Sequence, residues 1–409
     1  MNPYRTLRSV VRLEGIETDR VERRLRHAAS VADLRLIAKR RLPGGVFDYI
    51  DGAAEDERTL AANENAFAQA TFRPRVLRGL AKVDIATTLL GQPVDYPLVL
   101  APTGFTRIAD PQGELAVARA AVRAGLPYTL STLSTRSIEE VRAVSDGRLW
   151  FQVYAWRDRG LVREMIDRAA AASYEALVLT VDTAVLGRRE RDVRRGFSLP
   201  PSIRLATLVD GARHPEWTWR FVRSEPIRFA NVVGQAVGDG ASPVTLSDYI
   251  NTQFDPALSW ADIDWLRSVW DERIVIKGIQ TVEDAVLAAD SGVDAIALSN
   301  HGGRQLDGAP ASFDLVAPVA DAVGGRIEII CDGGLRRGSD IVKAVAAGAN
   351  AAMAGRAYLY ALGAAGEQGV DRLLTWLRSD VERVMTLLGA STIAELSRDL
   401  LEIRPRRPT

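Results

Sequence analysis

Short apolar runs alternate with Ala- and Leu-rich stretches along the chain from residue 97 onward. Eight runs end in glycine or polar residues: PLVLAPTG (97–104), PYTLST (127–132), LWFQVYA (149–155), ALVLTVD (176–182), IVIKGI (274–279), AIALSN (295–300), EIICDGG (328–334) and AAMAGR (351–356). Their continuous apolar character is typical of parallel strands covered on both faces. Stretches such as 113–125, 282–292 and 339–349 have the composition of helices, with a glycine at or beside the end.

The spacing of the runs predicts the fold class. Successive run ends lie 22 to 32 residues apart, except for an interval of 97 between Val181 and Gly278. Eight strand–helix units in series predict an α/β protein with a (β/α)8 (TIM) barrel. The long interval predicts an insertion at about residues 190–260, after strand 4, on the face where barrels carry their active sites. The competing doubly wound sheet usually shows GxGxxG after its first strand, which APTGF lacks.

We expect residues 1–30 to form a charged N-terminal extension, helical or frayed, and residues 31–400 to form a single barrel domain. The extension contains no apolar run like that of a signal peptide. An uninterrupted apolar stretch of about 18 residues is absent from the sequence, which argues against a transmembrane helix. The sequence therefore predicts a soluble cytoplasmic protein.

Composition narrows the class of function. Of 409 residues 47% are hydrophobic and 25% charged, as in ordinary globular proteins. Lys+Arg and Asp+Glu number 52 each, so the chain has no overall basic field to hold nucleic acid. A single cysteine, Cys331, excludes a disulfide framework and argues against a cysteine-based metal site.

Almost every predicted strand ends in a hydrogen-bonding or charged side chain. Strand ends often meet water, so a polar residue at one of them is ordinary. This set, however, combines amide, phenol, carboxylate, amine and imidazole groups at the end of the barrel where active sites lie. The set is Thr103, Ser131, Gln152, Tyr154, Thr180, Asp182, Lys277, His301, Asp332 and Arg356.

Three groups of residues at these strand ends suggest specific chemistry. His301 stands beside glycines with Arg304 three residues later, and a base next to a fixed cation suits proton abstraction from an anion. Asp182 is the natural carboxylate partner of that imidazole, unless it caps a helix or pairs with an arginine. The loops DGGLRRG (332–338) and AGRA (354–357) lie where barrels often bind phosphate. Lys277, within an apolar run, suits either an electron-rich cofactor ring or a structural salt bridge.

These residues resemble the FMN-dependent L-2-hydroxy-acid oxidase and dehydrogenase family, which includes glycolate oxidase, L-lactate dehydrogenase and mandelate dehydrogenase. The resemblance extends from about residue 31 to about residue 398. It is carried by FDYIDGAAEDE (47–57), APTGF (101–105), LSTLST (130–135), WFQVY (150–154), LTVDT (179–183), GRRERD (187–192), IVIKGI (274–279), SNHGGRQLDG (299–308) and DGGLRRGSDIVKAVAAGA (332–349).

The resemblance implies a role for each matching residue. His301 resembles the active-site base and Asp182 its supporting carboxylate. Arg189 and Arg304 resemble the pair that holds the substrate carboxylate, assisted by Tyr49, and Tyr154 resembles the phenol near the substrate oxygen. Positions that resemble the FMN site are Pro102, Thr103, Gly104, Ser131, Gln152, Thr180 and Lys277 around the isoalloxazine, and Asp332, Gly333, Gly334, Arg336, Gly355 and Arg356 around the ribityl phosphate. The implied reaction takes a 2-hydroxy acid to its 2-oxo acid, with the electrons passing to FMN and then to a quinone or oxygen. Many members are homotetramers, so we expect a homo-oligomer.

Some positions indicate the lactate/mandelate dehydrogenase branch. Gly104 and the stretches 183–200 and 208–223 resemble that branch, and Leu133 replaces a bulky aromatic of glycolate oxidases, which leaves room for a larger substrate. Residues 188–228 contain ten Arg against five acids, interleaved with aromatics. This segment suits peripheral membrane contact through about residues 190–230 at the inner face of the cell membrane, a lid, or a subunit contact.

Other functions are compatible with parts of this pattern. An isopentenyl-diphosphate isomerase or an inosine-monophosphate-dehydrogenase-like barrel shares the phosphate loops, but does not require His301, Arg304 and Arg189 together. A member of the same family could act on a peptide-derived redox cofactor. The third alternative is a non-catalytic flavin-binding or scaffold protein. In that case, replacing His301 would leave any measured turnover unchanged.

Overall fold

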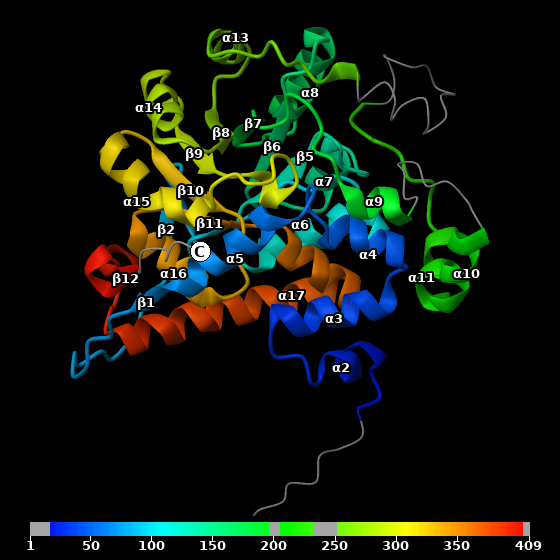
Figure 1. Ribbon diagram of the computed structural model, residues 1–409, viewed down its shortest axis with the longest axis horizontal. Helices are drawn as coiled ribbons and strands as arrows, with labels where there is room; N and C mark the ends of the chain where they lie inside the picture. Colours follow the sequence, from blue (N-terminus) through cyan, green and yellow to red (C-terminus); the bar gives the residue numbers. More distant parts are fainter. Residues whose placement is uncertain (1–16, 196–204, 233–251, 404–409) are drawn as a thin grey trace, which may run out of the picture.

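Eight parallel strands close into a barrel in the computed structural model, which describes residues 17–195, 205–232 and 252–403 (Figure 1). The strands are β4 (Leu98–Leu100), β5 (Tyr128–Ser131), β6 (Leu149–Tyr154), β7 (Ala176–Thr180), β8 (Arg273–Ile279), β9 (Ala295–Leu298), β10 (Glu328–Asp332) and β11 (Ala351–Ala354). Seven lie within one of the eight apolar runs and β8 begins one residue before its run, and β11 pairs with β4 to complete the circle. The (β/α)8 prediction is therefore confirmed.

A helix follows each barrel strand and covers the outside of the sheet (Figure 1). In chain order these helices are α6 (Gly113–Arg123), α7 (Ile138–Ala143), α8 (Arg159–Ala171), α13 (Ala261–Val269), α14 (Val282–Asp290), α15 (Ser312–Val323), α16 (Gly338–Ala347) and α17 (Arg356–Leu388). Their starts have local causes. Ser137 and Glu140 form a capping box at α7, and the Thr281 hydroxyl accepts the Asp284 amide at α14.

The barrel interior is packed at its N-terminal end. Trp150, Val178 and Val275 are fully buried there, together with Leu89 of a small hairpin formed by β2 (Thr87–Leu89) and β3 (Gln92–Val94). The hairpin is fixed to the barrel, because Glu328 at the start of β10 accepts the Leu90 amide. The hairpin closes this end of the barrel, and the C-terminal strand ends are left to form the site.

The segment before the barrel packs against helix α17 and against the loops at the C-terminal ends of the barrel strands. It forms α2 (Arg20–Leu25), α3 (Val31–Arg41), α4 (Gly44–Asp51) and α5 (Arg58–Gln69), and α3 lies along α17 (Figure 1). Strand β1 (Ala70–Phe72) pairs with β12 (Leu401–Ile403) near the end of the chain. The helical extension expected for residues 1–30 is seen as α2, and residues 1–16 lie outside the described part.

The predicted insertion after the fourth barrel strand contains α9 (Glu190–Arg195), α10 (Leu205–Arg213) and α11 (Pro215–Val222). Helix α11 is fixed beside the loop after β4, because the Trp217 indole donates to the Ile108 carbonyl at 2.8 Å. The Arg107 guanidinium, buried in that loop, donates to the Glu225 carbonyl at 2.6 Å. Residues 196–204 and 233–251 of the insertion lie outside the described part. Among the described helices, none is long and apolar enough to cross a bilayer.

Candidate active site

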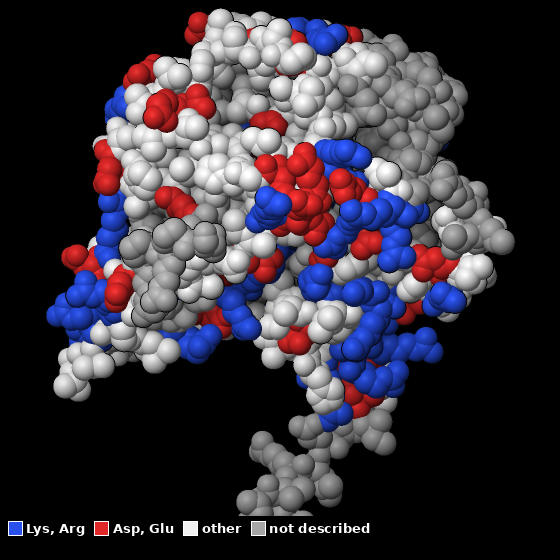
Figure 2. All heavy atoms as spheres, viewed as in Figure 1, with Lys and Arg blue, Asp and Glu red and all other residues white. Residues whose placement is uncertain are grey.

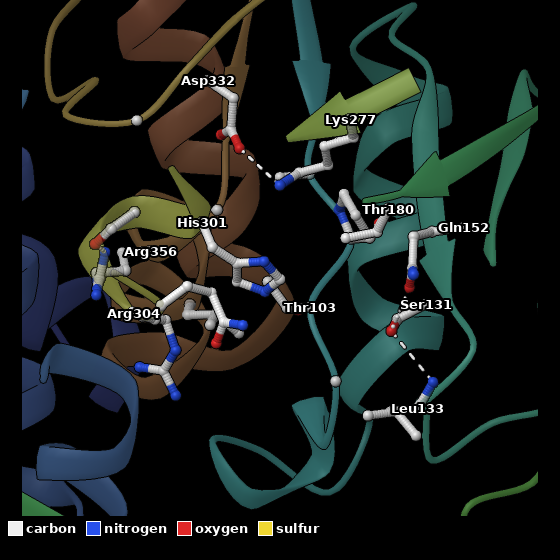
Figure 3. A pocket seen from close by; sticks show the side chains of 18 of the residues that line it. Thr103, Ser131, Leu133, Gln152, Thr180, Lys277, His301, Arg304, Asp332 and Arg356 are labelled. Atoms are coloured by element: carbon white, nitrogen blue, oxygen red, sulfur yellow. Dashed lines mark hydrogen bonds and ion pairs between the residues drawn. The ribbon is translucent and has the colours of Figure 1, made fainter. Parts of the chain in front are cut away.

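One cavity of about 490 Å³ opens at the C-terminal ends of the barrel strands (Figure 3). This volume is typical of sites for small molecules and cofactors. The structure brings almost all of the predicted site residues to its wall: Tyr49, Pro102, Thr103, Gly104, Ser131, Gln152, Tyr154, Thr180, Arg189, Lys277, His301, Arg304, Asp332, Gly333, Gly334, Arg336, Gly355 and Arg356. The exception is Asp182, which lies behind His301 and lines a neighbouring cavity.

His301 and Asp182 form a hydrogen-bonded pair, in which the imidazole is 24% exposed at the cavity wall. His301 Nδ1 lies 3.0 Å from Asp182 Oδ1, and the carboxylate is 1% exposed. Because a carboxylate only accepts hydrogen bonds, Nδ1 carries the proton and Nε2 is the basic nitrogen. Burial lowers the pKa of His301 and outweighs the opposing effect of Asp182. Burial would raise the pKa of Asp182, but His301 and Lys277 outweigh it and hold that pKa below its usual range.

The turn that carries His301 is fixed by groups outside the barrel strands. His301 has a left-handed backbone, with φ of 57°. The preceding Asn300 exchanges two amide hydrogen bonds with Asn63 of α5, at 2.8 and 2.9 Å. Asn300 also accepts the Gly303 amide. Helix α5 therefore sets the direction of the imidazole.

Gly278 makes room for the carboxylate behind the imidazole. The pairing of β8 with β9 is irregular between Lys277 and Ile279, and Gly278 has φ of +110°. A Cβ atom at this position would lie 2.9 Å from Asp182 Cβ. Only glycine combines this conformation with such a close approach.

Two guanidinium groups lie against one aromatic ring at the cavity wall. The guanidinium carbons of Arg304 and Arg189 lie 5.1 and 5.9 Å from the centre of the Tyr49 ring. Arg304 donates to the carbonyls of Tyr49 and Gly52 at 2.8 and 2.9 Å. Burial, together with the nearby Arg189 and Arg356, lowers the pKa of Arg304 to about 9. This clustering of cations favours an anion in the cavity.

Lys277 is held by two residues that follow other strands. Its Nζ atom lies 3.1 Å from Asp332 Oδ2 and donates to Ser299 Oγ at 2.9 Å, and the Ser299 hydroxyl donates to Asp332 at 2.7 Å. Burial would lower the pKa of Lys277, but Asp332 and Asp182 outweigh it and raise that pKa. The ammonium group therefore stays charged inside the barrel mouth.

Several buried polar atoms of this wall point to a bound ligand. Among the residues that the structure describes, Gln152 Nε2 and Thr180 Oγ1 have no hydrogen-bond partner, although Gln152 Oε1 accepts the Ser131 hydroxyl at 3.0 Å. Buried polar atoms are rarely left unpaired, so these two suit the polar edge of a cofactor ring. Gly333 and Gly334 have φ of 121° and 81°, which leaves the backbone accessible at the predicted phosphate site.

The two arginines of the predicted phosphate loops already have protein partners. Arg336 donates to Glu64 Oε1 at 2.8 Å. Arg356 donates to the carbonyls of Gly302 and Gly52, each at 2.7 Å, and to the carbonyl of Ile50 at 3.1 Å. The partners of Arg356 are neutral, so its positive charge is not cancelled.

Sequence reasoning missed part of the site. It did not include Ser299, although this residue directly precedes the SNHGG turn, nor Asp192, which lines the cavity near Arg189 and Arg304. It also missed most of an apolar wall made by Phe105, Leu133, Leu186, Phe229 and Phe254. These side chains come from loops, whose positions have no periodic signal in the sequence.

Comparison with known proteins identifies the family. The model of the FMN-dependent dehydrogenase family matches residues 38–403. The chain is 42% identical to an L-lactate dehydrogenase of Caulobacter vibrioides, covering 93% of this chain and 99% of that protein. It is 45% identical to a Mycobacterium tuberculosis protein provisionally named L-lactate dehydrogenase, covering 99% and 96%.

Solved structures show the same likeness. A monotopic membrane protein, (S)-mandelate dehydrogenase, superposes with a TM-score of 0.89 at 39% identity, covering 92% of this chain and all of that one. A mandelate oxidase superposes with a TM-score of 0.79 at 39% identity, covering 92% and 98%. The fold and the site thus define an FMN-dependent oxidoreductase. The chain belongs to the FMN-dependent dehydrogenase family, which confirms the resemblance found in the sequence.

The pairing of Asp182 with His301 can be tested without any substrate. Because Asp182 raises the pKa of His301 against the effect of burial, Asp182→Asn should lower that pKa further. Titration of histidine-labelled protein by NMR measures it, and with three histidines in the chain His301→Gln assigns the signal. An unchanged His301 pKa in Asp182→Asn would show that the pair is not coupled.

Proposed function

We propose that the protein oxidises a lactate- or mandelate-like L-2-hydroxy acid to the 2-oxo acid. The observation that supports this most strongly is the convergence of an imidazole–carboxylate pair, His301 and Asp182, with two guanidinium groups, Arg189 and Arg304, at one cavity. A 2-hydroxy acid presents a carboxylate next to a carbinol. This arrangement offers cations for the first group and a base for the second.

In the proposed complex, Arg189 and Arg304 hold the substrate carboxylate, with the Tyr49 ring between them. Arg189 Nε is buried without a hydrogen-bond partner in the described part of the chain, which suits a guanidinium awaiting an anion. Charge-assisted bonds from planar guanidiniums fix both the position and the orientation of a carboxylate. The carbinol is thereby directed toward His301 and Tyr154.

His301 acts as the base in this proposal. Its Nε2 accepts a proton from the substrate, and Asp182 stabilises the imidazolium that results. FMN, when bound, supplies the acceptor for the two electrons. Lys277 provides a fixed positive charge near the cofactor ring, and Gln152, Thr180, Ser131 and the 102–104 loop hold that ring. The loops of Asp332–Gly334, Arg336 and Gly355–Arg356 hold the ribityl phosphate.

The apolar wall favours a substrate side chain larger than a methyl group. The Phe105 and Phe229 rings pack at a tilt with ring centres 5.4 Å apart, and Phe254 lies edge-on to Tyr154 at 5.2 Å. Leu133 completes this surface. An aryl or long aliphatic side chain would pack against more of this apolar wall than a lactate methyl does.

The acceptor of the electrons is proposed to be a membrane quinone, with oxygen as the alternative. Helices α10 and α11 expose Leu208, Val209, Trp219 and Val222, at 59, 44, 60 and 73%. Figure 2 shows Lys and Arg side chains gathered over α2, α3 and α9, next to these helices. Exposed apolar residues beside cations suit peripheral contact with an anionic bilayer, at the cytoplasmic side. The likeness to a monotopic (S)-mandelate dehydrogenase supports this.

The reaction itself can be tested by anaerobic reduction. We expect L-mandelate or L-lactate to bleach the flavin absorbance under argon, and His301→Gln to slow this by about 10²–10⁴-fold, because the base is lost. The variant should keep its flavin, since the carboxamide preserves the shape of the site. Oxygen or a soluble quinone added afterwards identifies the acceptor. A flavin that no 2-hydroxy acid bleaches would favour the peptide-derived substrate instead.

The pH dependence follows from the two shifted groups. Because His301 must be neutral to accept a proton and its pKa is lowered, the acid limb of kcat/KM should have its midpoint below pH 6.5. Arg304 must be charged to bind the carboxylate, so kcat/KM should fall as the pH rises through about 9. Steady-state rates from pH 5 to 10 measure both limbs. A profile that still climbs between pH 7 and 8 would contradict the assignment of His301.

Membrane contact is tested by vesicle sedimentation. Trp219→Ala combined with Val222→Asp should weaken binding to vesicles containing phosphatidylglycerol by about 10-fold or more, because apolar area is lost and a charge is added at the bilayer surface. Bleaching by the substrate should be unchanged, since neither residue lines the cavity. Leu387→Ala, an equally exposed apolar site on α17, serves as the control. Equal binding of all three proteins would argue against contact through α10 and α11.

A further inference from the structure

Arg191 lies two residues after Arg189 and connects the insertion to the segment before the barrel. Its Nη1 donates to Asp51 Oδ2 at 2.8 Å, and its Nη2 pairs with Glu57 Oε2. Asp51 ends helix α4, two residues after Tyr49, and Glu57 follows in the next turn. The contact therefore ties the segment that carries Arg189 to the segment that carries Tyr49. Both of these residues flank the proposed carboxylate site.

Asp51 is a firm anchor rather than a surface partner. Its side chain is 3% exposed, and it also receives Arg35 from α3 and the Tyr360 hydroxyl from α17 at 2.8 Å. Burial would raise the pKa of Asp51, but Arg35, Tyr360 and Arg191 outweigh it and lower that pKa to about 2. The carboxylate is thus charged throughout the working range of pH, and donors from three elements hold it.

The backbone around Arg189 is held on both sides. The Glu55 amide donates to the Arg188 carbonyl at 2.9 Å. On the other side Gly187 packs directly on the loop after β9. A Cβ atom on residue 187 would clash with the Arg304 carbonyl oxygen. The Arg189 side chain, in contrast, lies over the Tyr49 ring near Asp192, and its Nε has no hydrogen-bond partner among the described residues. Its direction therefore depends on the backbone, which Arg191 clamps.

We propose that Arg191 is a positioning residue for substrate binding, which aligns Arg189 with Arg304 by clamping the loop to Asp51 and Glu57. This inference rests on the proposed function. The clamp is proposed to affect how tightly the substrate carboxylate binds, and not the proton transfer itself, because Arg191 does not line the cavity. A long unclamped side chain would occupy many rotamers, and a misplacement of about 1 Å is enough to weaken a contact strongly.

The test compares Arg191→Gln with the intact flavoenzyme. We expect KM for the hydroxy acid, and the Kd of unreactive oxalate read from the flavin spectrum, to rise by about 10- to 100-fold, with kcat within about 3-fold. Arg191→Lys should recover part of the affinity, because it can reach one carboxylate. Arg194→Gln is the matched control on the same helix, since its partner Glu190 lies four residues away on α9 itself.

A second variant shows whether Arg191 acts through Arg189. With Arg189→Met already in place, adding Arg191→Gln should change KM and the Kd of oxalate little, because the group that it positions is gone. Equal effects of Arg191→Gln with and without Arg189 would overturn the inference. If Arg191→Gln is insoluble, Glu57→Gln removes one arm of the clamp, and an unchanged Kd of oxalate then overturns it.

The two levels of proposal fail in different ways. A wild-type protein that no hydroxy acid reduces, and that does not bind oxalate, refutes the proposed function. A wild-type protein that is reduced, with Arg191→Gln showing the same KM and Kd, refutes only the clamp.

Discussion

Uncancelled positive charge at a buried barrel mouth is the constraint on which the rest of this structure depends. Arg304 and Arg356 are held by the carbonyls of Tyr49, Ile50, Gly52 and Gly302, which are neutral acceptors. Carbonyls satisfy the guanidinium hydrogens and remove no charge, in contrast to a carboxylate. The site therefore keeps a positive field in a region of low dielectric, where a carboxylate or a phosphate is the stabilising partner.

This arrangement explains why the site is not built from the barrel alone. The strand ends supply His301, Lys277 and Asp332, but all of the carbonyls that hold the arginines, except that of Gly302, come from the end of α4. The carbonyl groups at a helix C-terminus carry partial negative charge, so α4 is suited to receive cations. The N-terminal segment is thus a part of the site and not an appendage, and its pairing with the end of the chain through β1 and β12 fixes it to the barrel.

Elements outside the barrel repeat form the apolar part of the cavity wall. The apolar wall is contributed by loops and by Phe229 and Phe254 of the insertion, and α11 is fixed against the loop that follows β4. The insertion thus shapes the cavity from inside and exposes apolar residues outside. A single segment in this way contributes both to the cavity wall and to the outer surface, while the barrel is built from the regular strand–helix units.

The sequence by itself determined the barrel, the place of the insertion, and most of the polar groups at the mouth. Buried parallel strands must be apolar throughout, and the closing residues of a strand lie at one rim, so both leave a regular signal. Only the tertiary structure decided that Asn63 directs His301, that Ser299 joins Lys277 to Asp332, and that the partners of Arg356 are carbonyls. It also brought Arg191 to Asp51, 140 residues away along the chain. Such contacts depend on how distant loops and helices meet in space, and residue spacing along the chain carries no record of that.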